Sequence, residues 1–148
     1  MSLCCRGQTL NLPDNKVFCD TSFFFASLCP HDTNFEKAGA LLEYCKDNAV
    51  SIYTTWDIIS ETATLLRYRA SHKVAVEFID EVKPVLSIIK YDDTIRDAAE
   101  KVFKKLSRDK RLSFCDAISF LVITELLEDM PCLTFDRDFK NLGLLVYP

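Results

Sequence analysis

The chain has 148 residues, a length that suits one compact domain, and its 49% hydrophobic and 27% charged residues are ordinary values for a folded globular protein. With only 3 glycines and 5 prolines, long disordered linkers are not expected. The formal net charge of -4 argues against a general nucleic-acid coating protein, but it does not exclude an enzyme that acts on nucleic acid, because net charge says little about local fields.

The first half of the chain alternates between strand-like and helix-like patterns. Residues 1–15 are expected to be an N-terminal extension that ends in a turn, and residues 16–148 to be the domain. An apolar strand at 16–19 leads into Asp20-Thr21-Ser22, which resembles a helix cap before an apolar phenylalanine run. The elements expected next are a helix at 33–48, a half-buried strand at 50–54, and helices at 56–68 and 72–82, the last stopped by Pro84.

The second half continues the same alternation. An apolar β-branched run at 85–89 predicts a third strand, and Asp92-Asp93-Thr94 opens a helix that runs to about Leu106. After a basic loop, Ser113 caps the most apolar helix, which reaches residue 126 or 127. The last elements are a strand at 132–134, a brief helix from Asp136 to near Gly143, and a strand at 144–147. This order predicts a single α/β domain with a mainly parallel central sheet flanked by helices.

Neither the cysteines nor the apolar runs indicate a secreted or membrane protein. The 7 cysteines include no C-x-x-C pair, so neither a zinc ribbon nor a thioredoxin-type motif is supported. We expect buried or half-buried free thiols in a reducing cell, and Cys4-Cys5 is only weak evidence for metal binding or cross-linking. No apolar run is long enough to cross a bilayer and no secretory signal pattern opens the chain, so we expect a cytoplasmic protein.

Three acidic residues are placed to meet at one edge of the expected sheet. Asp20 directly follows the first strand, and Asp136 follows the strand at 132–134 after one intervening residue. Glu61 lies about one and a half turns into the helix after the strand at 50–54. In an open parallel sheet, ligands bind in the crevice outside the carboxyl ends of the strands. These acids are therefore candidates for one site.

A fourth acid, Asp116, lies in the first turn of the most apolar helix. A carboxylate entering such surroundings is costly to desolvate unless it is paired, hydrogen-bonded or bound to metal. Taken singly, each acid has a simpler interpretation: Asp116 as a first-turn acid after Ser113, Asp20 and Asp136 as helix caps, Glu61 as a solvated helix residue. The argument for a common site rests on the four contexts together.

These contexts resemble the PIN-domain nucleases, and within them the small VapC-like toxins of toxin–antitoxin pairs. The two segments nearest the C-terminus are the most specific and the glutamate segment the least. Their order and spacing span residues 17–147 and leave only the first fifteen or so outside. The matching segments are Val17-Phe18-Cys19-Asp20-Thr21-Ser22-Phe23, Ile59-Ser60-Glu61-Thr62, Leu112-Ser113-Phe114-Cys115-Asp116-Ala117 and Leu133-Thr134-Phe135-Asp136-Arg137-Asp138-Phe139.

The resemblance implies an Mg²⁺- or Mn²⁺-dependent endoribonuclease, acting as a toxin. Such hard cations prefer carboxylate and water ligands, activate water and stabilise charge on phosphoryl oxygens. Asp20, Asp116 and Asp136 would be the metal ligands, and Glu61 would bind metal directly or through water, or orient the attacking water. Clustered carboxylates without metal would repel one another and take up protons.

Further residues are expected to support the carboxylates. Asp138 is a possible auxiliary acid, although an exposed partner of Arg137 or Lys140 is the interpretation we favour for it. The supporting polar residues expected near the metal ligands are Ser22, Ser113, Thr134 and Asp138.

A basic stretch leads into the helix of Asp116, as binding to a phosphate backbone would require. The alternative for any one of these residues is an ordinary solvated helix face. The resemblance points to RNA as the substrate, to a homodimer and to inhibition by a small antitoxin protein. We expect at least two of Phe23, Phe24 and Phe25 to be core residues, although these rings and Trp56 lie near the site. The residues expected to bind RNA are Arg67, Arg69, Lys105, Arg108, Lys110 and Arg111.

Three other interpretations stay open. One keeps the fold but makes the protein a non-toxin PIN nuclease in RNA processing, or one that acts on DNA. Another is a non-catalytic α/β binding module with a degenerate site, against which the four intact acids argue. The last is a flavodoxin- or receiver-like domain, but the chain lacks the adjacent acid pair after the first strand and the lysine after a late strand.

Overall fold

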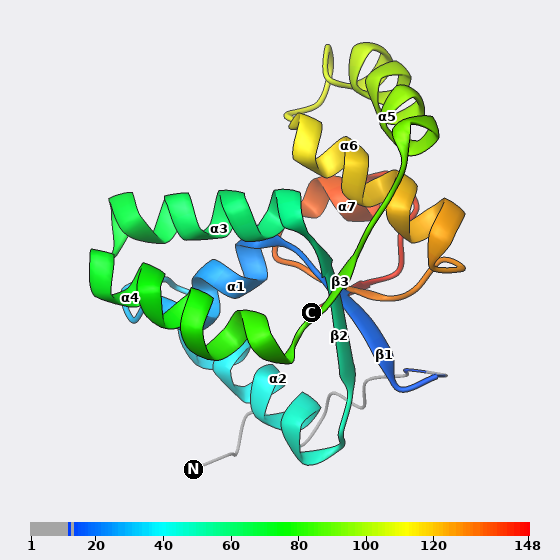
Figure 1. Ribbon diagram of the computed structural model, residues 1–148. Coiled ribbons are helices and arrows are strands. Elements are labelled where there is room, and N and C mark those ends of the chain that lie inside the picture. Colours follow the sequence, from blue (N-terminus) through cyan, green and yellow to red (C-terminus); the bar gives the residue numbers. More distant parts are fainter. Residues whose placement is uncertain (1–11, 13) are drawn as a thin grey trace.

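The computed structural model describes Leu12 and residues 14–148 (Figure 1). Most of the expected N-terminal extension, including Cys4-Cys5, lies outside the described residues. The strands of the described part are β1 (Lys16–Cys19), β2 (Ser51–Thr55), β3 (Ser87–Ile89), β4 (Cys132–Leu133) and β5 (Val146–Tyr147). The α-helices are α1 (Thr21–Leu28), α2 (Phe35–Asp47), α3 (Trp56–Arg69), α4 (His72–Glu77), α5 (Asp93–Leu106), α6 (Phe114–Leu121) and α7 (Arg137–Asn141).

The strands form one sheet in the order β3-β2-β1-β4-β5, and every pair in it is parallel. In Figure 1, α1 to α4 lie to one side of the strands, while α6 and α7 lie to the other with α5 packed against α6. The predicted α/β fold with a mainly parallel sheet is confirmed. Because all strands point the same way, the residues that follow them emerge at one common edge.

The core is aromatic and aliphatic, with Phe18, Phe23, Phe24 and Phe78 fully buried. The rings of Phe24 and Phe78 pack at 5.5 Å between centroids, which joins α1 to the segment after α4. Phe23 and Phe24 are thus core residues as predicted, and Phe25 is half-buried. The cysteines of the described part are free: Cys19, Cys29, Cys45 and Cys132 are buried and Cys115 is half-buried, as expected.

Two helices depart from the expected form. The helix expected at 72–82 is α-helical only to Glu77, and it continues as a π-helix, η1 (Phe78–Val82). Pro84 does not stop it but lies within a 3-10 turn, η2 (Lys83–Val85), because a proline in the first turn of a helix gives up no hydrogen bond. The apolar helix after Ser113 likewise becomes a π-helix, η3 (Val122–Leu126). Among the described helices, none is long and apolar enough to span a membrane.

Candidate active site

Asp20 is the most buried of the four predicted acids, with 4% of its surface exposed. It leaves β1 in an extended conformation and caps α1, accepting a hydrogen bond from the Phe23 amide on Oδ1 at 3.2 Å. The hydroxyl of Ser22 donates to the same oxygen at 2.8 Å, and that of Thr134 donates to Oδ2 at 2.7 Å. Both carboxylate oxygens are therefore held in place.

The two hydroxyls are themselves oriented by backbone amides. The amide of Phe135 donates to Ser22 Oγ at 2.9 Å, and the amide of Asp136 donates to Thr134 Oγ1 at 3.0 Å. Each hydroxyl accepts a hydrogen bond from an amide, so its single hydrogen is directed at Asp20 as a hydrogen-bond donor. This network joins the carboxyl ends of β1 and β4, which are neighbours in the sheet although more than a hundred residues apart.

Burial and hydrogen bonding act in opposite directions on Asp20. Burial raises the pKa of its carboxyl to about 7, although the hydrogen bonds from Thr134, Ser22 and Phe23 lower it. The charge of Asp116 adds to the increase. The negative charge of Asp20 is thus disfavoured by desolvation in this buried position, and a nearby cation would offset that free-energy cost.

Asp116 is held by a reciprocal cap at the start of α6. Its amide donates to Ser113 Oγ at 3.0 Å, and the Ser113 amide donates to Asp116 Oδ2 at 3.0 Å. This capping box holds the half-buried carboxylate at the N-terminus of an apolar helix. Burial raises its pKa to about 6, the bonds from Ser113 lower it, and the charges of Asp136 and Glu61 raise it.

Asp136 caps α7 and accepts the Asp138 amide on Oδ1 at 2.9 Å. Its pKa is raised, first by burial and then by the charge of Asp138, while the bond from the Asp138 amide lowers it. The interpretation of Asp138 as an ion-pair partner of Arg137 or Lys140 is wrong: the ion pairs of the described residues include neither. Asp138 is half-buried and acts electrostatically on Asp136 instead.

Glu61 is exposed on α3 and lines a hollow of about 470 Å³ between α3 and the start of α6. Its charge contributes to the raised pKa of Asp116, so the two side chains are near each other. Burial raises the pKa of the Cys115 thiol, and Glu61, which lines the same hollow, raises it further. We expected Cys115 only as a packing thiol, although its place beside Asp116 in the first turn of α6 could have suggested this proximity. The hollow is lined by Asp57, Ser60, Glu61, Thr64, Leu65, Tyr68, Arg69 and Cys115.

The structure therefore brings all four predicted acids to the carboxyl edge of the sheet. Asp116 is the central member, since it interacts electrostatically with Asp20, Asp136 and Glu61. Within residues 14–148, no three His, Cys, Asp or Glu side chains converge closely enough to enclose a metal ion. Mg²⁺ nevertheless suits this donor set, because it keeps several waters and is usually bound through one or two carboxylates. Burial is the main cause of the raised pKa values of Asp20 and Asp116, and a bound cation would offset the cost of their charged forms.

The predicted RNA-binding residues are less closely gathered. Arg69 lines the hollow of Glu61, whereas Arg67 is exposed on α3 outside it. Lys105 lies in the last turn of α5. Arg108, Lys110 and Arg111 lie in the loop from α5 to Ser113, the residue that caps the helix of Asp116.

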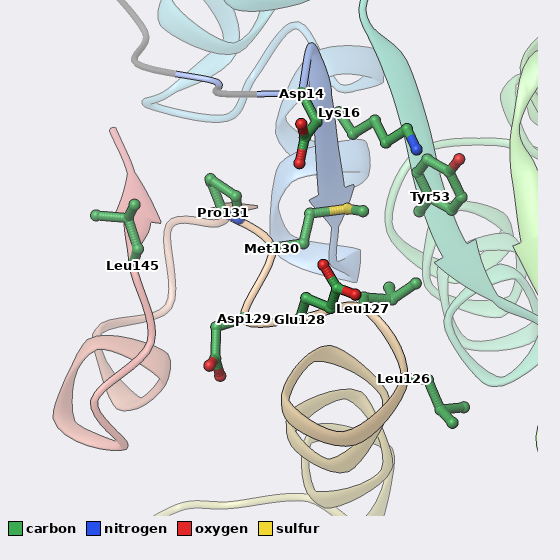
Figure 2. A pocket seen from close by; sticks show the side chains of 10 residues that line it. All are labelled: Asp14, Lys16, Tyr53, Leu126, Leu127, Glu128, Asp129, Met130, Pro131 and Leu145. Atoms are coloured by element: carbon green, nitrogen blue, oxygen red, sulfur yellow. The ribbon is translucent and has the colours of Figure 1, made fainter.

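A more enclosed hollow, of about 370 Å³, lies at the opposite edge of the sheet (Figure 2). Lys16 at the start of β1 and Pro131 just before β4 line it, together with Glu128 and Asp129 of the preceding loop. No predicted site residue lines this hollow. The chemistry that the acids can perform is therefore confined to the carboxyl edge.

Comparisons with known proteins show which family and which fold the chain shares. Residues 17–145 match the family model of the PIN domain. A VapC ribonuclease of Archaeoglobus fulgidus is 30% identical over 124 residues, which cover 82% of this chain and 77% of that protein. The crystal structure of Mycobacterium tuberculosis VapC20, a toxin that cleaves the sarcin-ricin loop, has a TM-score of 0.74 and 25% identity, with 87% of this chain and 96% of that one covered.

A further solved structure shows the same fold at lower identity. VapBC2 of Rickettsia felis, bound to a DNA fragment from its promoter, has a TM-score of 0.62 with 12% identity. The match covers 89% of this chain and 97% of that one.

Proposed function

The chain belongs to the PIN domain family, with VapC ribonucleases among its relatives, and we propose that it is a metal-dependent endoribonuclease and the toxin of a toxin–antitoxin pair. The observation that carries the proposal is Asp20, a buried carboxylate with both oxygens hydrogen-bonded and with Asp116 close enough to raise its pKa. A helix cap alone needs neither that burial nor a neighbouring acid. A site for a hard cation needs both oxygen ligands and concentrated negative charge.

Asp20, Asp116 and Asp136 would hold Mg²⁺ or Mn²⁺. When bound, such an ion lowers the pKa of a water molecule and stabilises charge on phosphoryl oxygens. Ser22 and Thr134 keep the Asp20 carboxylate in one orientation, and Ser113 does the same for Asp116. Rigid ligands of this kind need no rearrangement as charge develops in the transition state.

Glu61 has a different role in the proposal. It is exposed and lines the hollow from the flank of α3, together with Cys115. A carboxylate in that position is free to orient the attacking water or accept its proton. Arg69 in the same hollow, and the basic loop before Ser113, would bind the phosphates on either side of the scissile bond.

The proposed partners follow from the same charges. A small antitoxin would place a basic side chain against the carboxylates and so exclude both metal and RNA. We further propose that the protein is a homodimer. We also propose that it acts in the cytoplasm, where its RNA substrate is present. Co-expression with the product of a neighbouring short reading frame, followed by a pull-down, tests the antitoxin.

The chemistry is tested with Asp116→Asn. This variant keeps the size and a hydrogen-bond acceptor of the Ser113 cap but removes the charge, so it should fold while losing RNA cleavage. EDTA should abolish cleavage by the unmodified protein, and Mg²⁺ or Mn²⁺ should restore it. Full cleavage under either condition would contradict the mechanism. Growth arrest on expression, lost in Asp20→Asn, separates a toxin from an RNA-processing nuclease.

A further inference from the structure

A second hollow opens at the carboxyl edge of the sheet, beyond β2 and β3. It has a volume of about 480 Å³, within the range of small-ligand sites. In the β2–β3 register, Thr55 pairs with Ile89, so Trp56 and Lys90 are the first residues beyond the edge of the sheet. We name it the Trp56 hollow; it is lined by Trp56, Asp57, Ser60, Ile89, Lys90, Tyr91 and Arg96.

The Trp56 hollow combines exposed aromatic surface with positive charge. The side chain of Trp56 is 53% exposed, and the Lys83 ammonium lies 5.3 Å from its ring centroid. The Arg96 guanidinium lies 5.6 Å from the ring centroid of Tyr91. Ile89 is the only aliphatic side chain in the lining, which makes a poor anchor for an apolar protein surface. Aromatic faces beside cations are instead what proteins use to bind single-stranded nucleic acid.

The acids around this hollow are already engaged. The Tyr91 hydroxyl donates to Asp57 Oδ2 at 2.6 Å, which also fixes the tyrosine ring. Asp93 pairs with Arg96 at 3.4 Å, and Asp92 caps α5 by accepting the Ile95 amide at 3.3 Å.

Two lysines near the hollow keep their charge available. Among the ion pairs of the described residues, none involves Lys83 or Lys90. Lys90 lines the hollow directly, and Lys83 lies over the indole of Trp56. Both can therefore attract an anionic group that approaches the aromatic faces.

The Trp56 hollow adjoins the hollow that contains Glu61. Asp57 and Ser60 line both this hollow and the hollow that contains Glu61. Along α3, the five-residue step from Trp56 to Glu61 is a rise of about 7.5 Å and a turn of about 140° about the helix axis. An RNA strand bound at Glu61 and Asp116 would therefore reach the indole by way of Asp57 and Ser60, around the flank of α3.

We propose that the Trp56 hollow binds one unpaired nucleotide of the RNA substrate, with its base stacked on Trp56 and its phosphate contacted by Lys90. This rests on the proposed function, since it assigns a subsite for that substrate. Stacking of a base on an aromatic ring is sequence-tolerant, so the subsite selects single-stranded over duplex RNA rather than a particular base.

Trp56 is the only tryptophan in the chain, so its fluorescence reports on this hollow alone. The full-length protein is titrated with a short single-stranded oligonucleotide in EDTA, and the titration is repeated with Asp116→Asn in Mg²⁺. Saturable quenching is expected, and an RNA duplex of the same sequence should quench much less. Binding is measured independently by the anisotropy of labelled RNA.

Variants separate stacking from general effects. Trp56→Ala should weaken binding about tenfold, whereas Trp56→Phe, which keeps an aromatic face, should lose only a few-fold. Lys90→Ala should weaken binding and reduce its salt dependence. The matched control is Leu145→Ala, because Leu145 is also 53% exposed but lies at the opposite edge of the sheet (Figure 2).

Each outcome decides one of the two proposals. RNA binding without quenching, or with equal affinity in Trp56→Ala, overturns the subsite while cleavage by the unmodified protein still supports the nuclease. Quenching without cleavage in Mg²⁺ or Mn²⁺ supports the subsite and overturns the nuclease. A fluorescence change on dilution of the protein alone means that a second copy of this chain covers Trp56, and the subsite is then wrong.

Discussion

Thr134→Val tests the network around Asp20 most directly. Valine has nearly the same shape as threonine, so the change removes the 2.7 Å hydrogen bond to Asp20 Oδ2 and leaves the Asp136 amide without its acceptor. Thr134 is 3% exposed, so water cannot easily replace the lost hydroxyl. A buried hydrogen bond to a charged group contributes about 2 kcal/mol to stability, and a neutral one about 1 kcal/mol.

The loss should therefore depend on pH. Burial raises the folded-state pKa of Asp20 from 3.8 to about 7, so the folded protein binds this proton more tightly than the unfolded chain does. The contribution of this carboxyl to stability is fully present below about pH 4 and is lost as pH rises to about 7. Thr134→Val removes a bond that lowers this pKa, so the variant should lose more stability above pH 7 than below it.

The measurement is urea unfolding in EDTA at pH 5.5 and pH 8.5. We expect a loss of about 1 kcal/mol at the lower pH and about 2 kcal/mol at the higher one. The control is Thr54→Val, since Thr54 is fully buried but donates at 3.1 Å to the backbone carbonyl of Cys19. Its loss should not change with pH. An equal loss in Thr134→Val at both pH values, or a greater one at pH 5.5, would refute the reasoning.

Three further predictions concern the carboxylates of the site as a group. In EDTA, the melting temperature should fall as pH rises from about 4 to about 7, because Asp20 and Asp116 have folded pKa values of about 7 and about 6. Adding Mn²⁺ at pH 7.5 should restore part of the lost melting temperature in the unmodified protein, and less of it in Asp116→Asn. Ser113→Ala breaks the capping box and should cost about 1 kcal/mol in urea unfolding; it should also slow RNA cleavage, while an unchanged rate would mean that the box does not position Asp116. Glu61→Gln should slow cleavage by roughly 10²- to 10⁴-fold without changing the melting temperature, because Glu61 is exposed, and a large drop in melting temperature would show a structural role instead.

Local pattern alone determined the class of fold. The order of the strands and helices along the chain follows from apolar periodicity, helix caps and β-branched runs, which act over a few residues. The strand at Lys16–Cys19 begins and ends where we expected. Gly143, with φ of 87°, lies just past α7 as predicted, because a residue in that conformation is usually glycine. The four candidate acids could be named because each lies next to an element boundary.

Whether a helical segment would be an α-helix, a π-helix or a 3-10 helix could not be predicted from the sequence pattern. A π-helix and an α-helix of equal apolarity have nearly the same sequence pattern, so the π-turns after Glu77 and Leu121 were missed. Proline signals the end of an α-helix, yet Pro84 is accommodated in a following 3-10 turn. Whether Asp138 would find a cation also depended on side-chain positions that spacing does not define.

The site itself was decided by tertiary structure. The sequence indicated that Asp20 and Asp136 follow strands, but not that β1 and β4 are neighbours, since strand order depends on packing between distant segments. That adjacency lets Thr134 and Ser22 hold one carboxylate from two ends of the chain. The same holds for Trp56, which the sequence placed only near the site: the pairing of β2 with β3 brings Lys90 to the same hollow, and the Trp56 side chain is half exposed there. Residue types and element boundaries are local properties, whereas burial, charge proximity and hydrogen-bond partners arise only when the sheet is assembled.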